Sequence, residues 1–188
     1  MRLVVRNMVC DRCRVAVART LREAGMAVAH VELGEVELER EPTPAQLEAA
    51  RALLKVEGFE LVDSPEATMI ARIKAAIVKM VHHNEAGAGR VKLSEHLSDA
   101  LHHEYSGLTA LFSQVEGITI EQYFLLQRIE RVKELIKYDE LTLSEIADRT
   151  GFSSVAHLSA QFKKLTGMTP SAFKAIGLGR TPLDQVGS

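Results

Sequence analysis

The alternation of hydrophobic and polar residues divides the chain into a mixed N-terminal part and a helical C-terminal part. In segment 35–39, Val36 and Leu38 alternate with three glutamates, which is typical of a strand with one buried face. Helices are predicted where apolar residues recur at helical spacing, as at Val17 and Leu21. The expected order is strand 2–6, helix 13–24, strands 28–33 and 35–39, helix 44–56 and strand 58–62. This βαββαβ order predicts a ferredoxin-like fold with two helices on one face of an antiparallel sheet.

A long helix and a loop are predicted to connect the two parts. The Ser-Pro pair at 64–65 has the sequence of an N-cap followed by a proline at the first helical position. We expect a helix over residues 66–83, and then a flexible loop over residues 84–89. The helix has one apolar face, formed by Ile70, Ile73, Ile77, Met80 and Val81.

Residues 141–174 have the pattern of a helix, a tight turn and a second helix. Thr142 and Glu145 form a capping box that starts the first helix. Gly151 stands where that helix should end in a left-handed residue, a conformation that glycine adopts at little cost. Ser153 is then expected to cap the second helix. The residues predicted to face inward from this second helix are Leu158, Phe162 and Leu165.

Residues 91–138 repeat this pattern. A capping box at Thr119 and Gln122 is expected to start a third, longer helix that runs to about residue 137. The spacing between Phe112 and Gly117 equals the spacing between Phe162 and Gly167 in the later segment. The apolar positions of the first two helices are Leu93, Leu97 and Leu101, followed by Leu108, Leu111 and Phe112.

The C-terminal segment resembles the AraC/XylS family of bacterial transcription regulators over residues 92–176. The resemblance rests on Leu143, Ile146, Ala147, Gly151-Phe152-Ser153, Phe162-Lys163-Lys164, Thr166-Gly167-Met168-Thr169-Pro170 and Phe173. It implies two helix-turn-helix units joined by a central helix, with the second helix of each unit in a major groove and the grooves about 34 Å apart. The residues that it places at the DNA are Ser106, Thr109 and Ala110 in the first unit, and Ser153, Ser154, Ala156, His157, Ser159, Ala160, Gln161, Lys163 and Lys164 in the second.

The first unit departs from the family pattern. His102 stands where the family has its turn glycine, and Ser113-Gln114 replaces the basic pair. We therefore expect the second unit to make the stronger and more specific contacts with DNA, with Lys163 and Lys164 on phosphates and His157 at a base edge. The first unit would touch DNA weakly or bind something else through His102, His103 and Tyr105. The cations of the central helix are assigned to a solvated face: Arg128, Arg131, Lys133 and Lys137.

Composition and charge are those of an ordinary globular protein. The chain has 188 residues, of which 46% are hydrophobic and 26% charged, and its net charge is −2. No apolar run approaches the roughly 18 residues of a membrane span, and no signal peptide is recognised, so we expect a cytoplasmic protein without a membrane partner. Residues 66–188 hold fourteen basic and fourteen acidic residues. DNA binding by a monomer should therefore be weak and salt-sensitive, and strengthened by a homodimer or an effector.

Cys10 and Cys13 are the only cysteines, and they lie between the first predicted strand and the first predicted helix. Backbone N–H groups at a helix N-terminus should lower the thiol pKa, and soft thiolates select ions such as Cu(I) and Zn(II). Residues 2–63 resemble the heavy-metal-associated domain of copper chaperones and metal pumps, through Met8-x-Cys10-x-x-Cys13 and Gly58-Phe59. The resemblance implies that Cys10 and Cys13 are metal ligands and that Met8 is a buried support for the loop.

Three interpretations of the cysteine loop remain open: a metal sensor, a reversible dithiol–disulfide switch, and a domain that keeps only the fold and docks partners. Cu(I) is favoured because two thiolates suffice for linear Cu(I), whereas tetrahedral Zn(II) requires about four ligands. Asp11 could be a third ligand for Zn(II), and His82 or His83 could complete a composite site with the cysteines.

The sequence thus predicts an α+β fold with a sensor domain at 1–63, a connector at 64–90, a DNA-binding domain at 91–176 and a flexible tail at 177–188. The predicted function is that of a transcriptional regulator that binds double-stranded DNA and responds to Cu(I) or Zn(II), with no organic cofactor. The alternative is a metal-transfer or thiol-redox protein whose helical half docks proteins. An enzyme is not expected, because the Walker, Gly-x-Ser-x-Gly and His-Glu-x-x-His motifs are absent.

Overall fold

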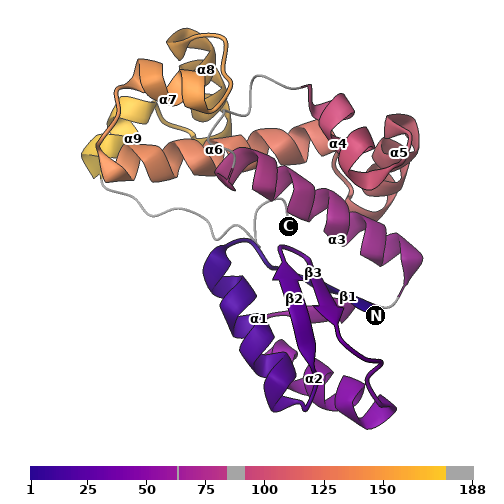
Figure 1. Cartoon of the computed structure of the whole chain (residues 1–188). Helices are drawn as coiled ribbons and strands as arrows, with labels where there is room; N and C mark the ends of the chain where they lie inside the picture. Colours follow the sequence, from indigo (N-terminus) through magenta and orange to yellow (C-terminus); the bar gives the residue numbers. More distant parts are fainter. Residues whose placement is uncertain (63, 84–91, 177–188) are drawn as a thin grey trace. The chain divides into compact units, whose positions relative to one another are not determined.

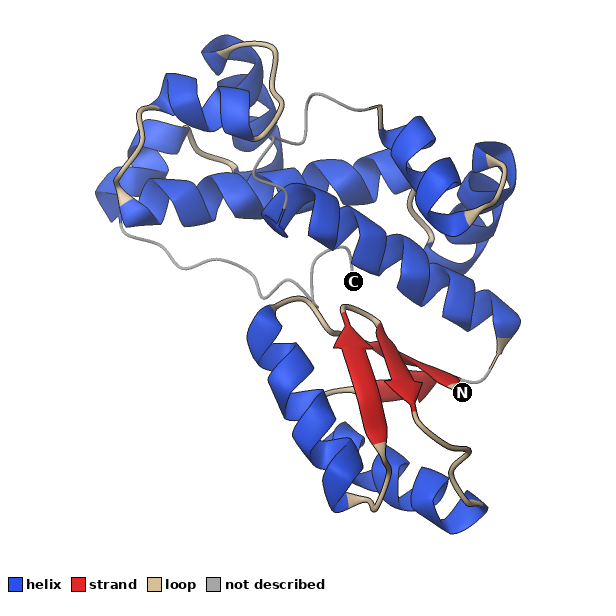
Figure 2. Cartoon of the chain, in the orientation of Figure 1, coloured by secondary structure: helices blue, strands red, loops and turns tan. Residues whose placement is uncertain are grey.

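The computed structural model describes residues 1–62, 64–83 and 92–176. Its contacts divide the chain into two compact units, Met1–Ala75 and Ala76–Ser188. The first unit is a βαββαβ arrangement that contains every described strand, and the second consists of helices (Figures 1 and 2). The predicted α+β fold class is confirmed. The predicted domain limits stay a prediction, and the predicted loop at 84–89 and tail at 177–188 lie outside the described residues.

The first unit is built on a four-stranded antiparallel sheet whose strand order is that of a ferredoxin-like fold. Its elements are β1 (Arg2–Arg6), α1 (Asp11–Glu23), β2 (Val28–Glu32), β3 (Glu35–Leu38), α2 (Pro44–Val56) and β4 (Glu60–Val62), and the strand order is β2-β3-β1-β4. One face of the sheet packs on α1 and α2 in a core that includes Leu3, Val5, Val17, Leu21, Val36, Leu38, Ala50 and Leu54. The alternation of Val36 and Leu38 with glutamates therefore marks the buried face, as predicted.

The following helix, α3 (Pro65–Val78), begins at the predicted cap, where Ser64 Oγ accepts a hydrogen bond from the Ala67 N–H at 3.0 Å. It continues as a π-helical turn, η1 (Lys79–His83), so the predicted helix is present but its last turn is wider. Arg72 pairs with Glu35 at 2.5 Å beside the β2–β3 turn. Gly34 in that turn has φ +84°, and a Cβ there would lie 2.9 Å from Ala75 Cβ, so this position requires glycine.

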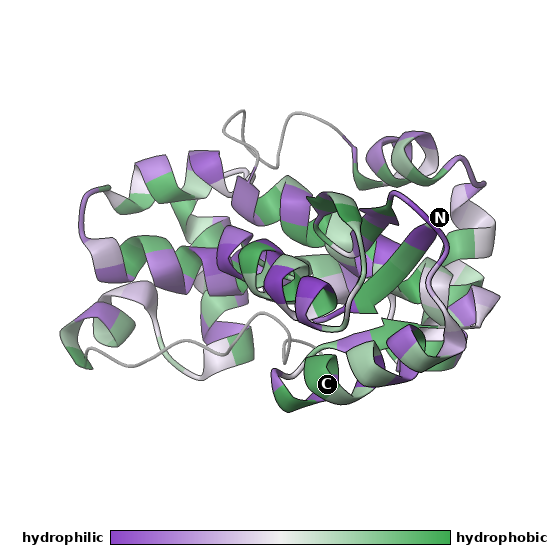
Figure 3. Ribbon diagram, turned by 60° about the horizontal axis from the view of Figure 1, so that its bottom comes forward, coloured by the Kyte–Doolittle hydropathy of each residue, from purple (hydrophilic) through white to green (hydrophobic). Residues whose placement is uncertain are grey.

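The second unit contains α4 (Leu93–Leu101), α5 (Tyr105–Glu116), α6 (Ile120–Tyr138), α7 (Leu143–Arg149), α8 (Val155–Thr166) and α9 (Pro170–Ile176). Green and purple residues share each helix in Figure 3, as expected for helices with one buried face. The core between α6, α7, α8 and α9 contains Ile129, Val132, Ile146, Leu158, Phe162 and Phe173. In the earlier helix-turn-helix, Phe112 of α5 packs on Tyr123 of α6 with ring centroids 5.5 Å apart.

Two expectations for α8 are wrong. The N-cap is Ser154 rather than Ser153, because the extended backbone of Ser154 lets its Oγ accept a hydrogen bond from the His157 N–H at 3.1 Å. Leu165 is 40% exposed rather than buried. At that end of α8 the core contains Phe173, whose ring lies 5.5 Å from that of Phe162, and Leu165 is not part of it.

Candidate nucleic-acid interface and cysteine site

The turn between α7 and α8 has the predicted helix-turn-helix geometry. The capping box is present, since Thr142 Oγ1 accepts from the Glu145 N–H at 3.3 Å and Glu145 Oε2 accepts from the Thr142 N–H at 2.7 Å. Gly151 has φ +72°, and the Phe152 N–H donates to the Ala147 carbonyl at 2.8 Å. The left-handed glycine therefore ends α7 and redirects the chain into α8.

The residues predicted to contact DNA in the second helix-turn-helix, formed by α7 and α8, share one property: none is buried. Leu158 and Phe162 point into the core and have no exposed surface. The remaining positions form an outward-facing set that we call the α8 surface. Its exposed members are Ser153, Ser154, Ala156, His157, Ala160, Lys163 and Lys164, and its half-buried members are Ser159 and Gln161. This surface carries two lysines and one imidazole, a combination that suits phosphate and base-edge contacts.

Within the α8 surface, His157 is fixed by neighbours from the turn. Its Nδ1 lies 3.0 Å from Ser153 Oγ. Its ring meets the Phe152 ring edge-on, with centroids 5.5 Å apart and planes at 85°. The imidazole is therefore held in place although it is exposed.

Arg128 of α6, assigned above to a solvated face, instead contacts the turn between α7 and α8. Arg128 Nε donates to the Thr150 carbonyl at 2.6 Å, and its guanidinium lies 3.8 Å from the centroid of the Phe152 ring. Burial lowers the pKa of Arg128 to about 10, so it remains a cation at neutral pH. The assignment was wrong because the partners of Arg128 are more than twenty residues away. The local signal was the Phe124 ring one helical turn earlier, 5.4 Å from the guanidinium.

The other cations of α6 differ among themselves. Arg131 and Lys133 are half-buried and bind Glu134 and Glu130 on the same helix at 2.7 Å and 2.5 Å. The predicted solvated face is therefore wrong for these two residues, because carboxylates one turn away keep them on the helix. Lys137 is exposed, as predicted.

In the first helix-turn-helix, formed by α4 and α5, His102 adopts the left-handed conformation, with φ +55°, that its alignment with the family glycine requires. Ser106 and Ala110 of α5 are exposed and Thr109 is half-buried, with its Oγ1 donating to the Ser106 carbonyl at 2.9 Å. The Tyr105 hydroxyl donates to Glu121 Oε1 at 2.6 Å, and burial together with this carboxylate raises the pKa of Tyr105. Tyr105 is therefore engaged within the unit.

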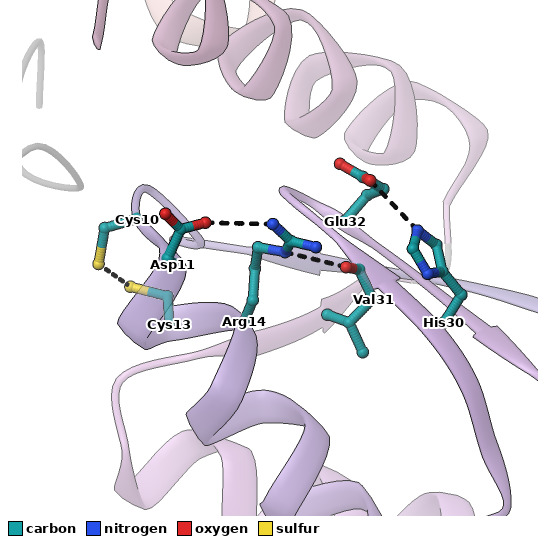
Figure 4. A network of polar contacts seen from close by, with 7 residues as sticks. All are labelled: Cys10, Asp11, Cys13, Arg14, His30, Val31 and Glu32. Carbon is teal, nitrogen blue, oxygen red and sulfur yellow. Dashed lines mark hydrogen bonds and ion pairs between the residues drawn. The ribbon is translucent and has the colours of Figure 1, made fainter. Parts of the chain in front are cut away.

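The cysteine loop places both sulfurs side by side (Figure 4). Cys10 is the N-cap of α1, Cys13 lies in its first turn, and their Sγ atoms are 3.0 Å apart. Met8 is buried, with 3% of its surface exposed, as predicted for a support of the loop. Burial and the hydrogen bond with Cys10 raise the pKa of the Cys13 thiol. The expected lowering is therefore wrong for Cys13, because desolvation outweighs the helix N-terminus.

The residues around the sulfurs fit a two-coordinate soft metal better than tetrahedral Zn(II). Asp11 lies beside the loop, but its Oδ1 accepts from Arg14 Nη1 at 3.1 Å, and Arg14 Nε donates to the Val31 carbonyl at 2.9 Å (Figure 4). Within the described parts of the chain, no group of three or more His, Cys, Asp or Glu side chains could hold a metal ion. The two thiols alone match the ligand number of linear Cu(I).

His82, considered above as a partner of the cysteines, has other neighbours. Its Nε2 lies 3.2 Å from Gln127 Oε1, and its Nδ1 lies 3.6 Å from Glu134 Oε2. Burial lowers the pKa of His82, although Glu134 acts in the opposite direction. These contacts give His82 a structural position between η1 and α6.

Comparisons with known proteins agree with this geometry. Residues 97–176 match a family model described as a helix-turn-helix domain. The chain is 40% identical over 65 residues to the probable transcriptional regulator LumQ of Photobacterium leiognathi, and the matched region covers 35% of this chain and 26% of LumQ. It is 39% identical over 67 residues to the transcriptional activator RhaR of Cronobacter sakazakii, and the matched region covers 36% of this chain and 24% of RhaR.

A solved structure, the C-terminal domain of the response regulator AraT from Geobacillus stearothermophilus, is similar in fold, with a TM-score of 0.50 and 24% identity over 60% of this chain and 88% of that one. Residues 97–176 therefore form a helix-turn-helix domain that is similar to those of transcription regulators. The chain spans about a quarter of the length of each of these two curated relatives. The heavy-metal-associated resemblance of residues 2–63 stays a prediction. In the described part of the chain, no helix has the length and apolar character needed to span a membrane.

Proposed function

We propose that the protein is a cytoplasmic, sequence-specific transcriptional regulator that binds double-stranded DNA mainly through the α8 surface. The observation that carries this proposal is the exposure of His157, Lys163 and Lys164 on a helix that the Gly151 turn starts and the core anchors. Lys163 and Lys164 hold phosphates, and His157 lies at a base edge. In the first helix-turn-helix, Ser106, Thr109 and Ala110 make a weaker contact with an adjacent groove, because α5 has no basic pair. A homodimer compensates for the neutral charge of the C-terminal half.

The test of DNA binding is a mobility-shift titration between about 50 and 200 mM salt. Each neutralised phosphate contributes a slope of about 0.9 in log affinity against log salt, so the double variant Lys163→Ala/Lys164→Ala should lower the slope by about 1.8. Lys137→Ala, which removes an exposed lysine from α6, is the matched control and should leave the slope unchanged. Equal slopes for the wild type, the double variant and the control would reject the proposal.

The second part of the proposal concerns the stimulus. Cys10 and Cys13 bind a thiophilic ion, Cu(I) in preference to Zn(II), and the bound ion orders the loop and changes the affinity for DNA. The observation in favour is the pair of sulfurs 3.0 Å apart at the N-terminus of α1, with no third ligand among the described residues. DNA affinity should be measured with and without Cu(I), for the wild type and for Cys10→Ser/Cys13→Ser. Unchanged affinity in all four cases would reject metal sensing and leave DNA binding in place.

The separation of the sulfurs also supports a second candidate, a thiol-redox or metal-transfer protein whose helical half docks proteins. A disulfide requires the sulfurs to approach from 3.0 Å to about 2.05 Å, and oxidised glutathione could accept the two electrons while both thiols lose their protons. This candidate predicts no salt-dependent duplex binding. The mobility-shift titration therefore separates the two functions.

A further inference from the structure

The imidazole of His157 is pre-organised on the α8 surface. Its Nδ1 lies 3.0 Å from Ser153 Oγ, and its ring packs edge-on against Phe152 at 5.5 Å. An exposed side chain normally loses rotamer freedom when it enters an interface, and this loss weakens binding. Because His157 is already held in place, it can bind a ligand with a smaller loss of rotamer freedom.

The support of His157 extends to the central helix. Phe152 is 5% exposed, and the guanidinium of Arg128 lies 3.8 Å from its ring centroid. Arg128 Nε also donates to the Thr150 carbonyl at 2.6 Å, immediately before the Gly151 turn. A continuous series of contacts thus runs from α6 through Arg128 and Phe152 to His157. The position of the exposed ring is therefore set by buried residues.

The contact with Ser153 determines which ring nitrogen is available to a ligand. A neutral imidazole has one donor and one acceptor nitrogen. Ser153 precedes α8, and the partial positive charge of the helix N-terminus favours a lone pair over an N–H at the adjacent Nδ1. With a lone pair at Nδ1, the Ser153 hydroxyl would donate to that nitrogen and Nε2 would carry the proton. For Nε2 itself, the described residues provide no hydrogen-bond partner.

On the premise that α8 binds DNA as proposed above, we infer that His157 determines base specificity by donating from Nε2–H to an acceptor in the major groove. Guanine presents two acceptors there, N7 and O6, whereas cytosine presents an amino donor. One base pair of the site should therefore show a preference for guanine and discrimination against cytosine on the contacted strand. Ser153, Phe152 and Arg128 are positioning residues in this arrangement.

The first test examines the ring without DNA. Long-range proton–nitrogen correlation spectra of the full chain, recorded at alkaline pH, distinguish the two tautomers of a neutral imidazole. His157→Gln assigns the signal. The wild type should show the Nε2–H tautomer, and Ser153→Ala should increase the Nδ1–H fraction. A wild-type ring protonated at Nδ1, or a Ser153→Ala ring identical to the wild type, would overturn the inference whether or not the protein binds DNA.

The second test examines base preference. Duplexes are selected from a random pool, and each position of the selected site is then changed to all four base pairs for the wild type, His157→Ala, Ser153→Ala and Lys163→Ala. At one position the wild type should prefer guanine over cytosine by roughly 5- to 10-fold, near the lower end of single base-pair effects. His157→Ala should reduce this ratio to below about twofold, and Ser153→Ala should give an intermediate ratio. Lys163→Ala should weaken all duplexes by a similar factor and keep the ratio.

The outcomes separate this inference from the proposed function. Retention of every base preference by His157→Ala, in a protein whose wild type selects a site, would overturn the inference alone. Failure of the wild type to select any site would reject both. All three substituted positions are exposed, so thermal unfolding should confirm that the variants remain folded.

Discussion

Arg128 donates from Nε to the carbonyl oxygen of Thr150 at 2.6 Å, so a cation of the central helix binds the end of α7 at the point where the chain turns into α8. The same guanidinium covers the Phe152 ring on the other side of Gly151. One side chain therefore contacts both sides of the turn. The orientation of α8 relative to α7 depends on this residue as well as on the glycine.

Arg128→Met should destabilise the second helix-turn-helix, because it removes the cation and keeps much of the apolar volume. A hydrogen bond from a charged group contributes about 1.5–3 kcal/mol, and a cation–aromatic contact about 0.5–2 kcal/mol. We expect a loss of about 2–4 kcal/mol in the free energy of opening, measured by native-state hydrogen exchange of the α7 and α8 amides. Lys137→Met on the exposed face of α6 should change it by less than about 0.5 kcal/mol. Equal effects of the two substitutions would contradict the role assigned to Arg128.

Removing the glycine at position 151 should lower the stability of the protein, whereas introducing a glycine at position 102 should raise it. Gly151 and His102 both have positive φ, +72° and +55°. Gly151→Ala should cost about 1–2 kcal/mol, because the left-handed region is unfavourable for a residue with a Cβ. His102→Gly removes that strain but gives the unfolded chain more freedom, so a net gain of about 0.5 kcal/mol is expected. Urea unfolding followed by circular dichroism checks both signs, and a loss of stability in His102→Gly would show that the histidine makes compensating contacts.

Features that depend on neighbours in sequence could be predicted from the sequence. The capping boxes at Thr119 and Thr142 are both present, because each is formed by residues within one helical turn. The left-handed turn at Gly151 and the burial of Leu158 follow from equally local rules. Such features were sufficient to predict the order of the elements, whereas the residues of the α8 surface were placed by the family resemblance.

Features that depend on tertiary contacts could not be predicted in this way. The sequence places Arg128 on a helix face that looks solvated, and only the folded unit brings Phe152 over it. The helix N-terminus predicted a lowered thiol pKa, which is wrong for Cys13 because the burial that raises its pKa comes from the folded loop. In both cases desolvation decides the outcome, and desolvation is not encoded in local spacing.

His82 should make the second unit sensitive to acid. Burial lowers the pKa of His82 in the folded state, with Glu134 opposing this and Arg131 adding to it. Below the unfolded-state pKa of about 6.5, the unfolded chain binds a proton that the folded chain does not, so stability falls as the pH is lowered from there toward the folded-state pKa. The loss attributable to one group has a limiting slope of about 1.4 kcal/mol per pH unit.

The measurement for His82 compares urea unfolding of the wild type and His82→Gln at several values between about pH 7.5 and 5. Glutamine can retain a hydrogen bond to Gln127 but does not titrate, so His82→Gln should lose less stability than the wild type over this range. His103→Gln, at an exposed position after α4, serves as the matched histidine control. A wild type and His82→Gln with parallel pH profiles would refute the prediction.

The reactivity of Cys13 should depend on Cys10. Burial and the hydrogen bond to Cys10 raise the pKa of the Cys13 thiol, and the thiolate is the species that reacts with iodoacetamide. Cys10→Ala removes the hydrogen bond and the neighbouring sulfur, so the pKa of Cys13 should fall and its alkylation at about pH 7.5 should become faster. Mass spectrometry under anaerobic conditions measures the rate of Cys13 alkylation in the wild type and in Cys10→Ala at each pH up to about pH 11. If the pKa is the cause, the alkylation rates of Cys13 in the wild type and in Cys10→Ala should converge at about pH 11, where Cys13 is a thiolate in both proteins. A ratio of the two rates that stays constant at every pH would instead mean that the substitution had opened access to the sulfur. Because a metal ion also binds only the thiolate, the same pH dependence should appear in the affinity for Cu(I), which should increase as the pH is raised.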